Sequence, residues 1–239
     1  MAAVGETSGR TRRSRKGRRR PLWRRILRWA LLAVLILVAI PLLLTPLYRI
    51  VAPTSTLMLW DRVTFQPVDR QWVTLDDVAP VLVRSVIASE DNFFCQHHGV
   101  DLGALREVIE SGANRGASTI AMQTARNLFL WQGGGIFRKG LEIPIAFYAD
   151  LVLGKRRLME IYLNIAEWGP GIFGIEAAAR HHFGVAASDL SGRQAALLAA
   201  VLPNPIVRDP ANPSGTVRNL ADIIQRRVAN GPDVFCLGL

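Results

Sequence analysis

The stretch Val86-Ile87-Ala88-Ser89-Glu90-Asp91-Asn92-Phe93-Phe94-Cys95-Gln96-His97-His98-Gly99 begins as an apolar helix and ends in a polar turn. Asp76 or Asp77 is expected to cap this helix, because apolar residues follow at helical spacing. Gly99 can stop a helix in the left-handed conformation. A carboxylate held by a helix in an aromatic, partly dry pocket has a raised pKa, as general-base chemistry requires. Glu90 is therefore the candidate base, and the alternative is a solvated helix end.

The positive charge of the chain is concentrated at its N-terminus. The 239 residues carry a formal net charge of +10, but eleven of the 29 Lys and Arg residues lie between Arg10 and Arg28. Before Trp29 the only acid is Glu6, so the remainder is formally neutral. This distribution argues against nucleic acid as a partner of the folded domain.

An uncharged apolar run from Trp29 to Tyr48 follows the basic block. About twenty helical residues at ~1.5 Å each span the ~30 Å hydrocarbon core of a bilayer. The positive-inside rule then predicts a cytoplasmic N-terminus, with everything after Arg49 outside and the arginines touching anionic lipid. A cleaved signal peptide is the alternative, but the run is long for one and no small-x-small cleavage site follows it. We therefore expect a retained single-pass anchor, in which Pro41 and Pro46 could kink the exit side.

The rest of the chain is predicted to be mostly helical. A connector with one or two short strands, such as Val63-Thr64-Phe65, follows the anchor, and a loop is expected around 169–174. The expected helices lie at 76–90, 101–114, 118–130, 137–153, 156–168, 175–183, 191–202 and 216–230.

Two cysteines and two histidine pairs are the remaining reactive side chains. Cys95 and Cys236 would face an oxidising compartment, where they could form a bridge or remain free thiols. The pairs His97-His98 and His181-His182 lack the spacing of a zinc site on a helix. We therefore predict no metal-ligating residues.

Two cationic segments accompany the candidate base. Arg115-Gly116-Ala117-Ser118-Thr119 precedes a helix whose free N–H groups suit an anion, and Arg126 adds a charge two turns later. Arg138-Lys139-Gly140-Leu141-Glu142 places two cations and an acid on one helical turn. Taken alone, the first segment is also explained by an ordinary helix cap and the second by a solvated helix face.

Together with three later blocks, these segments resemble the ordered motifs of the glycosyltransferase family 51 domain. The later blocks are Lys155 to Asn164, Glu167-Trp168-Gly169 and Ala195 to Pro205, and the resemblance covers about Leu57 to Asn230. It implies a mainly α, lysozyme-like, two-lobed domain with a small membrane-proximal lobe, preceded by one transmembrane helix. The expected organisation is a basic cytoplasmic tail (1–28), the anchor (29–48), a membrane-proximal connector (49–75), the glycosyltransferase domain (76–231) and a C-terminal tail (232–239).

The resemblance also implies a reaction, in which lipid II is polymerised into β-1,4-linked glycan at the outer face of a bacterial inner membrane. Glu90 would be the general base, and Glu142 would hold the cations near the pyrophosphate or help the leaving group. The residues implied to bind substrate are Ser118, Thr119, Gln123, Arg126, Asn127, Arg138 and Lys139. A divalent cation, Mg²⁺ or Mn²⁺, stays open as a cofactor, and proteins of cell-wall synthesis or division stay open as partners.

Three residues depart from the family pattern, and they affect the expected rate more than the fold. Met122 stands where a glutamine is usual, Arg126 where a lysine is usual, and Gly134 lies in a loop that often carries an arginine. Two rival functions are a lysozyme-like glycan hydrolase and a catalytically weak membrane-anchored scaffold. The cationic blocks argue against the hydrolase, because glycan hydrolysis releases no pyrophosphate.

Overall fold

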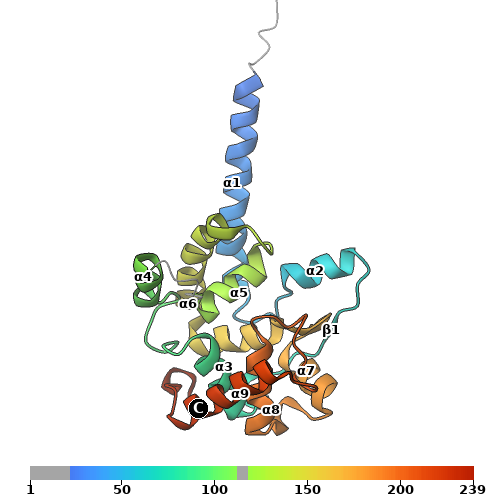
Figure 1. Ribbon diagram of the computed structural model, residues 1–239. Helices are drawn as coiled ribbons and strands as arrows, with labels where there is room; N and C mark the ends of the chain where they lie inside the picture. The colour runs from blue at the N-terminus through green and yellow to red at the C-terminus, as the bar shows by residue number, and fades with distance from the viewer. Residues whose placement is uncertain (1–21, 112–117) are drawn as a thin grey trace, which may run out of the picture. The chain divides into compact units, whose positions relative to one another are not determined.

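The computed structural model describes residues 22–111 and 118–239. By residue number, the chain divides into two compact units, 1–39 and 40–239. Helix α1 (Leu22–Leu47) carries the first unit and the start of the second. The second unit continues with α2 (Thr56–Val63), β1 (Asp69–Arg70), η1 (Leu75–Asp77), α3 (Pro80–Glu90), α4 (Leu102–Ser111), α5 (Ile120–Phe129), α6 (Gly135–Ile165), β2 (Glu167–Gly169), β3 (Ile172–Phe173), α7 (Ile175–Phe183), η2 (Ala187–Asp189), α8 (Gly192–Val201), α9 (Gly215–Ala229) and η3 (Phe235–Leu237). The expected mainly α fold is confirmed (Figure 1).

Helix α1 has the length and composition of a single membrane-spanning anchor. It contains 26 residues, and its most apolar window has a mean hydropathy of 2.7. Within the part of the chain that the structure describes, it is the one helix of this kind. The helix already includes Leu22, the first of the described residues, so it extends through the basic residues ahead of the expected start at Trp29.

The C-terminal end of α1 belongs to the second unit and is tied to α6. The Tyr148 hydroxyl donates to the Leu42 carbonyl at 3.0 Å, and the Arg157 guanidinium donates to the carbonyls of Tyr48 and Val51 at 2.8 and 2.9 Å. The Tyr48 ring stacks on Phe129 of α5 with centroids 6.0 Å apart. The exit of the anchor is therefore held by α5 and α6, which also carry candidate site residues.

The connector contains one short strand, β1, as predicted, but the strand is not at the expected position. Val63-Thr64-Phe65 is not a strand, because α2 extends to Val63 and Phe65 adopts a left-handed φ of 58°. Ser55 caps α2 by accepting from the Met58 N–H at 3.1 Å, and the Met58 side chain is fully buried. Local β propensity is overridden here by a cap and one buried contact.

A small sheet lies where a loop was expected. Its strand order is β1-β3-β2, with β1 parallel to β3 and β2 antiparallel to it. Gly171 turns the β2–β3 hairpin at a φ of +72°, and a Cβ there would lie 2.5 Å from the Pro67 carbonyl oxygen. Only glycine allows the connector to approach this closely, so the sheet joins the connector to the main helices.

Helices α3, α8 and α9 form the packed end of the second unit (Figure 1). Leu82, Val83, Val86 and Ile87 of α3 are fully buried. Burying each such side chain contributes roughly 1.5–3 kcal/mol. Helix α3 begins at Pro80, not at Asp76 or Asp77, because proline at the first helical position replaces a side-chain cap. Its last residue, Glu90, is thus placed by a rigid core helix.

Helix α6 contains the break expected at Gly154. This glycine has a φ of 73°, so two helical segments meet at a kink. Pro144 lies inside the first segment, and Tyr162 inside the second has a side chain that is 1% exposed. Because of this kink, α6 contributes both Glu142 and Tyr162 to the candidate site.

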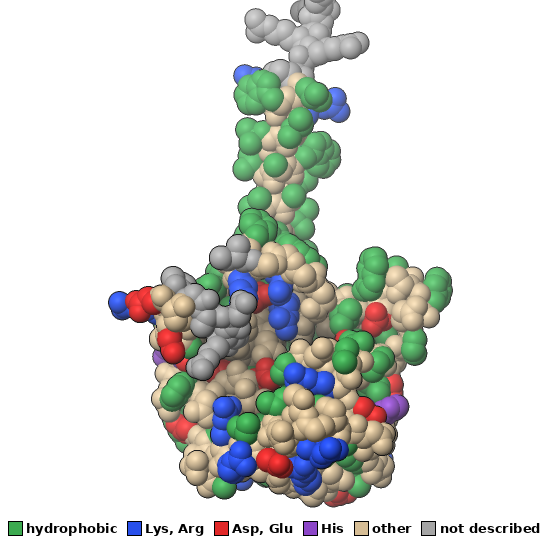
Figure 2. All heavy atoms as spheres, viewed as in Figure 1, with side chains coloured by type: hydrophobic (Ala, Val, Ile, Leu, Met, Phe, Trp, Pro, Cys, Tyr) green, Lys and Arg blue, Asp and Glu red, His purple; other side chains and the backbone are tan. Residues whose placement is uncertain are grey.

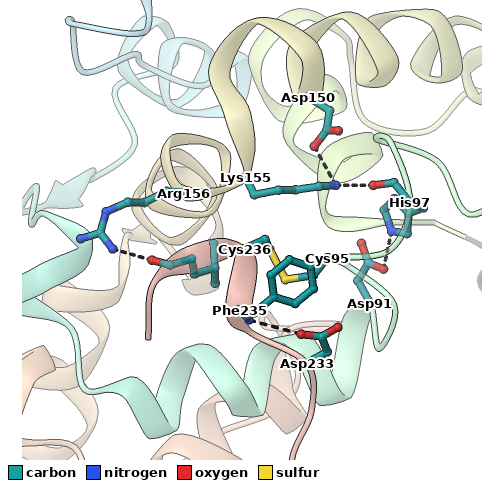
Figure 3. The surroundings of a disulfide bond; sticks show 10 residues. Asp91, Cys95, His97, Asp150, Lys155, Arg156, Asp233, Phe235 and Cys236 are labelled. Atoms are coloured by element: carbon teal, nitrogen blue, oxygen red, sulfur yellow. Dashed lines mark hydrogen bonds and ion pairs between the residues drawn. A yellow bond between two sulfur atoms is a disulfide. The ribbon is translucent and has the colours of Figure 1, made fainter.

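A disulfide links Cys95 to Cys236, whose Cα atoms are 5.5 Å apart. Of the two states that the sequence left open for these cysteines, the structure therefore has the bridge. It joins the turn after α3 to residues beyond α9. Val234 and Leu237 are buried, and the Arg156 guanidinium donates to the Leu237 carbonyl at 2.7 Å (Figure 3). Residues 232–239 therefore pack on the helical domain.

Candidate active site

The carboxylate of Glu90 is partly buried beside α5. Nε2 of Gln123 donates to its Oε2 at 2.8 Å, and the Ser89 hydroxyl is 3.3 Å from its Oε1. Burial raises the pKa of the Glu90 carboxyl, while the hydrogen bonds from Gln123 and Ser89 and the charge of Arg126 act to lower it. A carboxylate that accepts a proton more readily than an exposed glutamate is suited to general-base chemistry.

Asp91, directly after Glu90, joins α3 to α5. Its Oδ2 accepts the N–H of Ile120, the first residue of α5, at 3.0 Å. Its Oδ1 lies 2.8 Å from Nε2 of His97. Because Asp91 is only 7% exposed, both contacts are shielded from water. They set the spacing between the end of α3 and the helix that carries Gln123 and Arg126.

The turn after α3 is held by Lys155 (Figure 3). Its ammonium donates to the His97 carbonyl at 2.6 Å, pairs with Asp150 at 2.8 Å and lies 4.6 Å from the centroid of the Phe94 ring. Phe94 is fully buried and His97 is bonded to both Asp91 and Lys155, so both residues shape this turn. Gly99 ends the turn at a φ of +78°, where a Cβ would lie 2.5 Å from the Ala146 carbonyl oxygen.

A cavity of about 590 Å³ opens beside Gln123 and α6. Gln123, Arg126, Asn127 and Tyr162 form one part of its lining, and Asp61, Glu167 and Phe173 form another. Figure 2 shows Lys and Arg side chains around a hollow in this face of the second unit. Glu90 contacts the cavity lining through its hydrogen bond with Gln123.

Arg126 is the cation shared by both candidate acids. Its charge acts on the pKa of Glu90 and on the pKa of Glu142, so it lies near both carboxylates. Burial lowers the pKa of its guanidinium, and the carboxylates offset this effect. Its Nε is buried and donates to none of the residues that the structure describes. Because Arg126 also lines the cavity, its positive charge is available to an anionic ligand there.

Glu142 is buried, with 1% of its surface exposed, and its Oε1 accepts a hydrogen bond from the Arg138 guanidinium. The same guanidinium donates from Nε to the Gly133 carbonyl. Burial raises the pKa of the Glu142 carboxyl, and the charges of Arg138, Arg126 and Lys139 oppose that rise. Glu142 thus holds Arg138 in place and is also under the charges of Arg126 and Lys139; of these residues, Arg126 lines the cavity.

The structure distributes the other predicted substrate-binding residues unevenly. Asn127 lines the cavity, and Ser118 is partly exposed just before α5. Thr119 is buried instead: its hydroxyl donates to the Gly99 carbonyl at 2.6 Å and accepts the Met122 N–H at 3.2 Å. The hydroxyl of Thr119 is therefore used as a helix cap. Residues 112–117, including Arg115 to Ala117 and the expected end of α4, lie outside the described residues.

The three departures from the family pattern have different surroundings. Met122 is 1% exposed and belongs to the core. Gly134 has a φ of 88°, and a Cβ there would lie 2.8 Å from the Trp131 indole nitrogen. An arginine at this position would require the loop to change shape. Arg126 alone stands within the candidate site.

Sequence reasoning gave no role to Tyr162 or Asp91. Tyr162 reads as one more core aromatic, and only the fold brings its hydroxyl to Gln123. Glu167 and Asp61, from separate segments, line the cavity together. Burial raises the pKa of the Glu167 carboxyl, and the charge of Asp61 adds to that rise.

Comparison with known proteins agrees with this arrangement. The sequence model of the family described as "Transglycosylase" matches residues 59–229. Relatives named "Biosynthetic peptidoglycan transglycosylase" occur in Mesorhizobium japonicum, 58% identical over 94% of this chain and 98% of that relative, and in Agrobacterium fabrum, 54% identical over 91% and 98%. A relative of the same name from Brucella suis is 50% identical over 90% of this chain and 100% of that relative. The chain belongs to the transglycosylase family, whose domain is lysozyme-like.

Proposed function

We propose that this chain is a peptidoglycan glycosyltransferase that polymerises lipid II into β-1,4-linked glycan strands and releases undecaprenyl pyrophosphate. Membership of the transglycosylase family and the names of its relatives support this function. The observation that carries the proposal is geometric: Gln123, which donates to the Glu90 carboxylate at 2.8 Å, lines the same cavity as Arg126. The charge of Arg126 also acts on the pKa values of Glu90 and Glu142, both of which burial raises. A base on one side of a cation cluster matches a reaction that removes a proton and expels a pyrophosphate.

In this mechanism Glu90 takes the proton from the 4-hydroxyl of the GlcNAc of lipid II, the acceptor. The hydroxyl oxygen attacks the anomeric carbon of the growing strand, the donor, and inverts it. Burial makes the Glu90 carboxylate a stronger base, and its hydrogen bond from Gln123 orients it. Proton removal during attack avoids a free alkoxide.

The cations stabilise the departing pyrophosphate, on which negative charge grows as the bond breaks. Arg126 supplies its positive charge from the cavity lining, and Arg138 and Lys139 add charge from α6. Glu142 holds Arg138 through a buried ion pair, so the cluster is fixed before substrate arrives. Ser118, Gln123 and Asn127 would supply neutral hydrogen bonds to the sugar and phosphate oxygens.

A divalent cation, Mg²⁺ or Mn²⁺, would need oxygen ligands at this site. Among the residues that the structure describes, no three His, Cys, Asp or Glu side chains gather in a metal-binding group. The described part of the chain therefore offers no carboxylate cage, and most ligands of such an ion would come from pyrophosphate and water. The chemistry proposed here uses the chain's own cations.

The location that fits this reaction is the bacterial inner membrane, with the N-terminus in the cytoplasm and the catalytic domain in the periplasm. The basic residues before α1 favour that orientation. The Cys95–Cys236 disulfide supports it independently, because such bonds persist in oxidising compartments. Membrane lipids and proteins of cell-wall synthesis or division are then the partners within reach.

A polymerisation assay tests the proposal. Purified full-length protein in detergent is given lipid II, and the products are separated by length. We expect glycan polymer from the wild type and none from Glu90→Gln, while the thermal unfolding temperature of the variant stays close to that of the wild type. Polymer from Glu90→Gln at the normal rate would remove the base assignment.

The same assay separates the two rivals. Digestion of preformed glycan without polymer formation would identify a hydrolase. If the folded wild type performs neither reaction, the anchored scaffold becomes the better description. Glu110→Gln is a suitable control, because Glu110 is an exposed carboxylate on α4 whose ion-pair partner among the described residues is Arg106 of the same helix.

A further inference from the structure

The hydroxyl of Tyr162 ends a hydrogen-bonded chain that leads to the candidate base. It donates to Oε1 of Gln123 at 3.1 Å, and Nε2 of the same amide donates to Oε2 of Glu90 at 2.8 Å. Three helices supply the three residues: α6, α5 and α3. Tyr162 is 1% exposed, so its ring is fixed by the core.

Chemistry allows the chain to run in one direction only. An ionised carboxylate only accepts hydrogen bonds, so the amide must turn its NH₂ group toward Glu90. Its carbonyl oxygen then faces Tyr162, and the phenol must donate to it. A phenylalanine at position 162 would fill the same core but would leave Oε1 of Gln123 without this donor.

We propose that Tyr162 is a positioning residue for glycan transfer, acting through Gln123 to hold the Glu90 carboxylate in its reactive orientation. The inference rests on the proposed role of Glu90 as the general base. Gln123 lines the cavity, so its amide borders the region that substrate would enter. Without Tyr162 the amide would rotate toward water or substrate, and Glu90 would lose its strongest neutral donor.

The groups around Glu90 determine the sign of the expected pH effect. Helix α5 contributes Gln123 and the charge of Arg126, which both lower the pKa of Glu90, and α6 contributes Tyr162. The charge of Asp91, the next residue along the chain, raises that pKa. On the remaining sides, the Ala199 carbonyl of α8 accepts a hydrogen bond from the Ser89 hydroxyl, and the Arg227 guanidinium of α9 donates to the Ala88 carbonyl. Loss of the oriented amide therefore moves the pKa of Glu90 upward.

The experiment compares four proteins with the wild type in the lipid II assay between acid and neutral pH: Tyr162→Phe, Gln123→Leu, the double variant and Tyr148→Phe. Tyr148→Phe is the matched control, because it removes another bonded hydroxyl of α6 that faces Leu42 instead of Gln123. We expect Tyr162→Phe to lower kcat about tenfold with little change in KM, the size of one lost hydrogen bond. The acid limb of its profile should move to higher pH.

Double-variant analysis separates positioning from packing. If Tyr162 acts through Gln123, Gln123→Leu shifts the acid limb in the same direction, and adding Tyr162→Phe to it lowers kcat no further. Independent, multiplying losses would overturn the inference, as would a Tyr162→Phe enzyme with wild-type kcat and acid limb. Because Gln123→Leu changes only a partly exposed side chain, the pH readout remains even where Tyr162→Phe folds poorly.

Failure of this inference can be told apart from failure of the proposed function. An active Glu90→Gln enzyme contradicts the base assignment itself. An inactive Glu90→Gln enzyme together with a normal Tyr162→Phe enzyme contradicts only the role of Tyr162.

Discussion

Asp91, the residue directly after α3, accepts the backbone N–H of Ile120, which begins α5, across 3.0 Å. The bond is a helix cap supplied by a residue 29 positions earlier in the sequence. It fixes the end of one helix, where Glu90 sits, to the start of another, from which Gln123 and Arg126 project. The relative position of base and cation therefore depends on one buried carboxylate that takes no part in the chemistry.

Replacing Asp91 with Asn should destabilise the protein and lower its activity. The amide has one acceptor oxygen in place of two, so either the Ile120 N–H loses its partner or His97 must change to the tautomer in which Nε2 accepts, at a cost of about 1–3 kcal/mol in the free energy of unfolding. Asp101→Asn is the matched control, because Asp101 caps α4 by accepting the Ala104 N–H at 2.9 Å. Asn caps about as well as Asp, so this variant should stay within a few tenths of a kcal/mol of the wild type. Equal unfolding temperatures for both variants would contradict the bridging role.

Glu142→Gln should remove most polymerase activity and reduce stability. The side chains of Glu142 and Arg138 are 1% and 11% exposed, so the lost charge leaves a buried guanidinium poorly compensated. We expect a loss of about 3 kcal/mol, the lower end for a broken buried pair, because glutamine still accepts one hydrogen bond. Denaturant unfolding measures this change.

Glu110→Gln provides the comparison for that measurement. Glu110 and Arg106 form the same i, i+4 arrangement, but their side chains are 62% and 80% exposed. Their pair should contribute less than about 0.5 kcal/mol. If Glu142→Gln proved no more costly than Glu110→Gln, the buried cluster would not be held by this ion pair.

The activity should rise with pH through the ionisation of Glu90, because only the carboxylate form accepts a proton. Burial raises the pKa of this carboxyl above 4.5, so the acid limb of kcat/KM should lie at higher pH than that of an exposed glutamate. Arg126→Ala removes a charge that lowers this pKa, so the limb should move further up.

Arg126→Lys keeps the positive charge and should leave the limb nearly in place. We expect its activity to equal or exceed that of the wild type, since lysine is usual at this position in the glycosyltransferase family 51 pattern. Near-complete loss of activity would show that the guanidinium, including its buried Nε, has a role of its own. Rates measured at several pH values separate the two effects.

Reduction of the disulfide should lower stability. The bond closes a segment of 141 residues, and its loss should reduce the free energy of unfolding by about 2–5 kcal/mol. Thermal unfolding with and without a thiol reductant measures the effect. The double variant Cys95→Ser, Cys236→Ser is the control: the chain has two cysteines, so reductant should no longer change its unfolding temperature. A wild-type protein insensitive to reductant while the bond is demonstrably cleaved would show that the C-terminal residues dock without it.

Local sequence patterns determined much of the helical framework. Helix α7 runs from Ile175 to Phe183 as predicted, and Thr119 and Ser191 cap α5 and α8 near their predicted starts. These elements follow from apolar periodicity and from side chains that bond within a few residues. The patterns failed at Val63-Thr64-Phe65, where a distant contact of Met58 with the core decided the structure.

The sequence by itself determined which residue types this protein carries: an anchor, an acid at the end of an apolar helix, and cations in a recognisable order. The tertiary structure decided what those residues do, placing Asp91 at the start of α5, Lys155 beneath a turn and Tyr162 against Gln123. The physical reason is range. Helix periodicity and capping act over a few residues, whereas burial, pKa shifts and the Tyr162–Gln123–Glu90 chain join segments 33 to 39 residues apart, which only folding brings together.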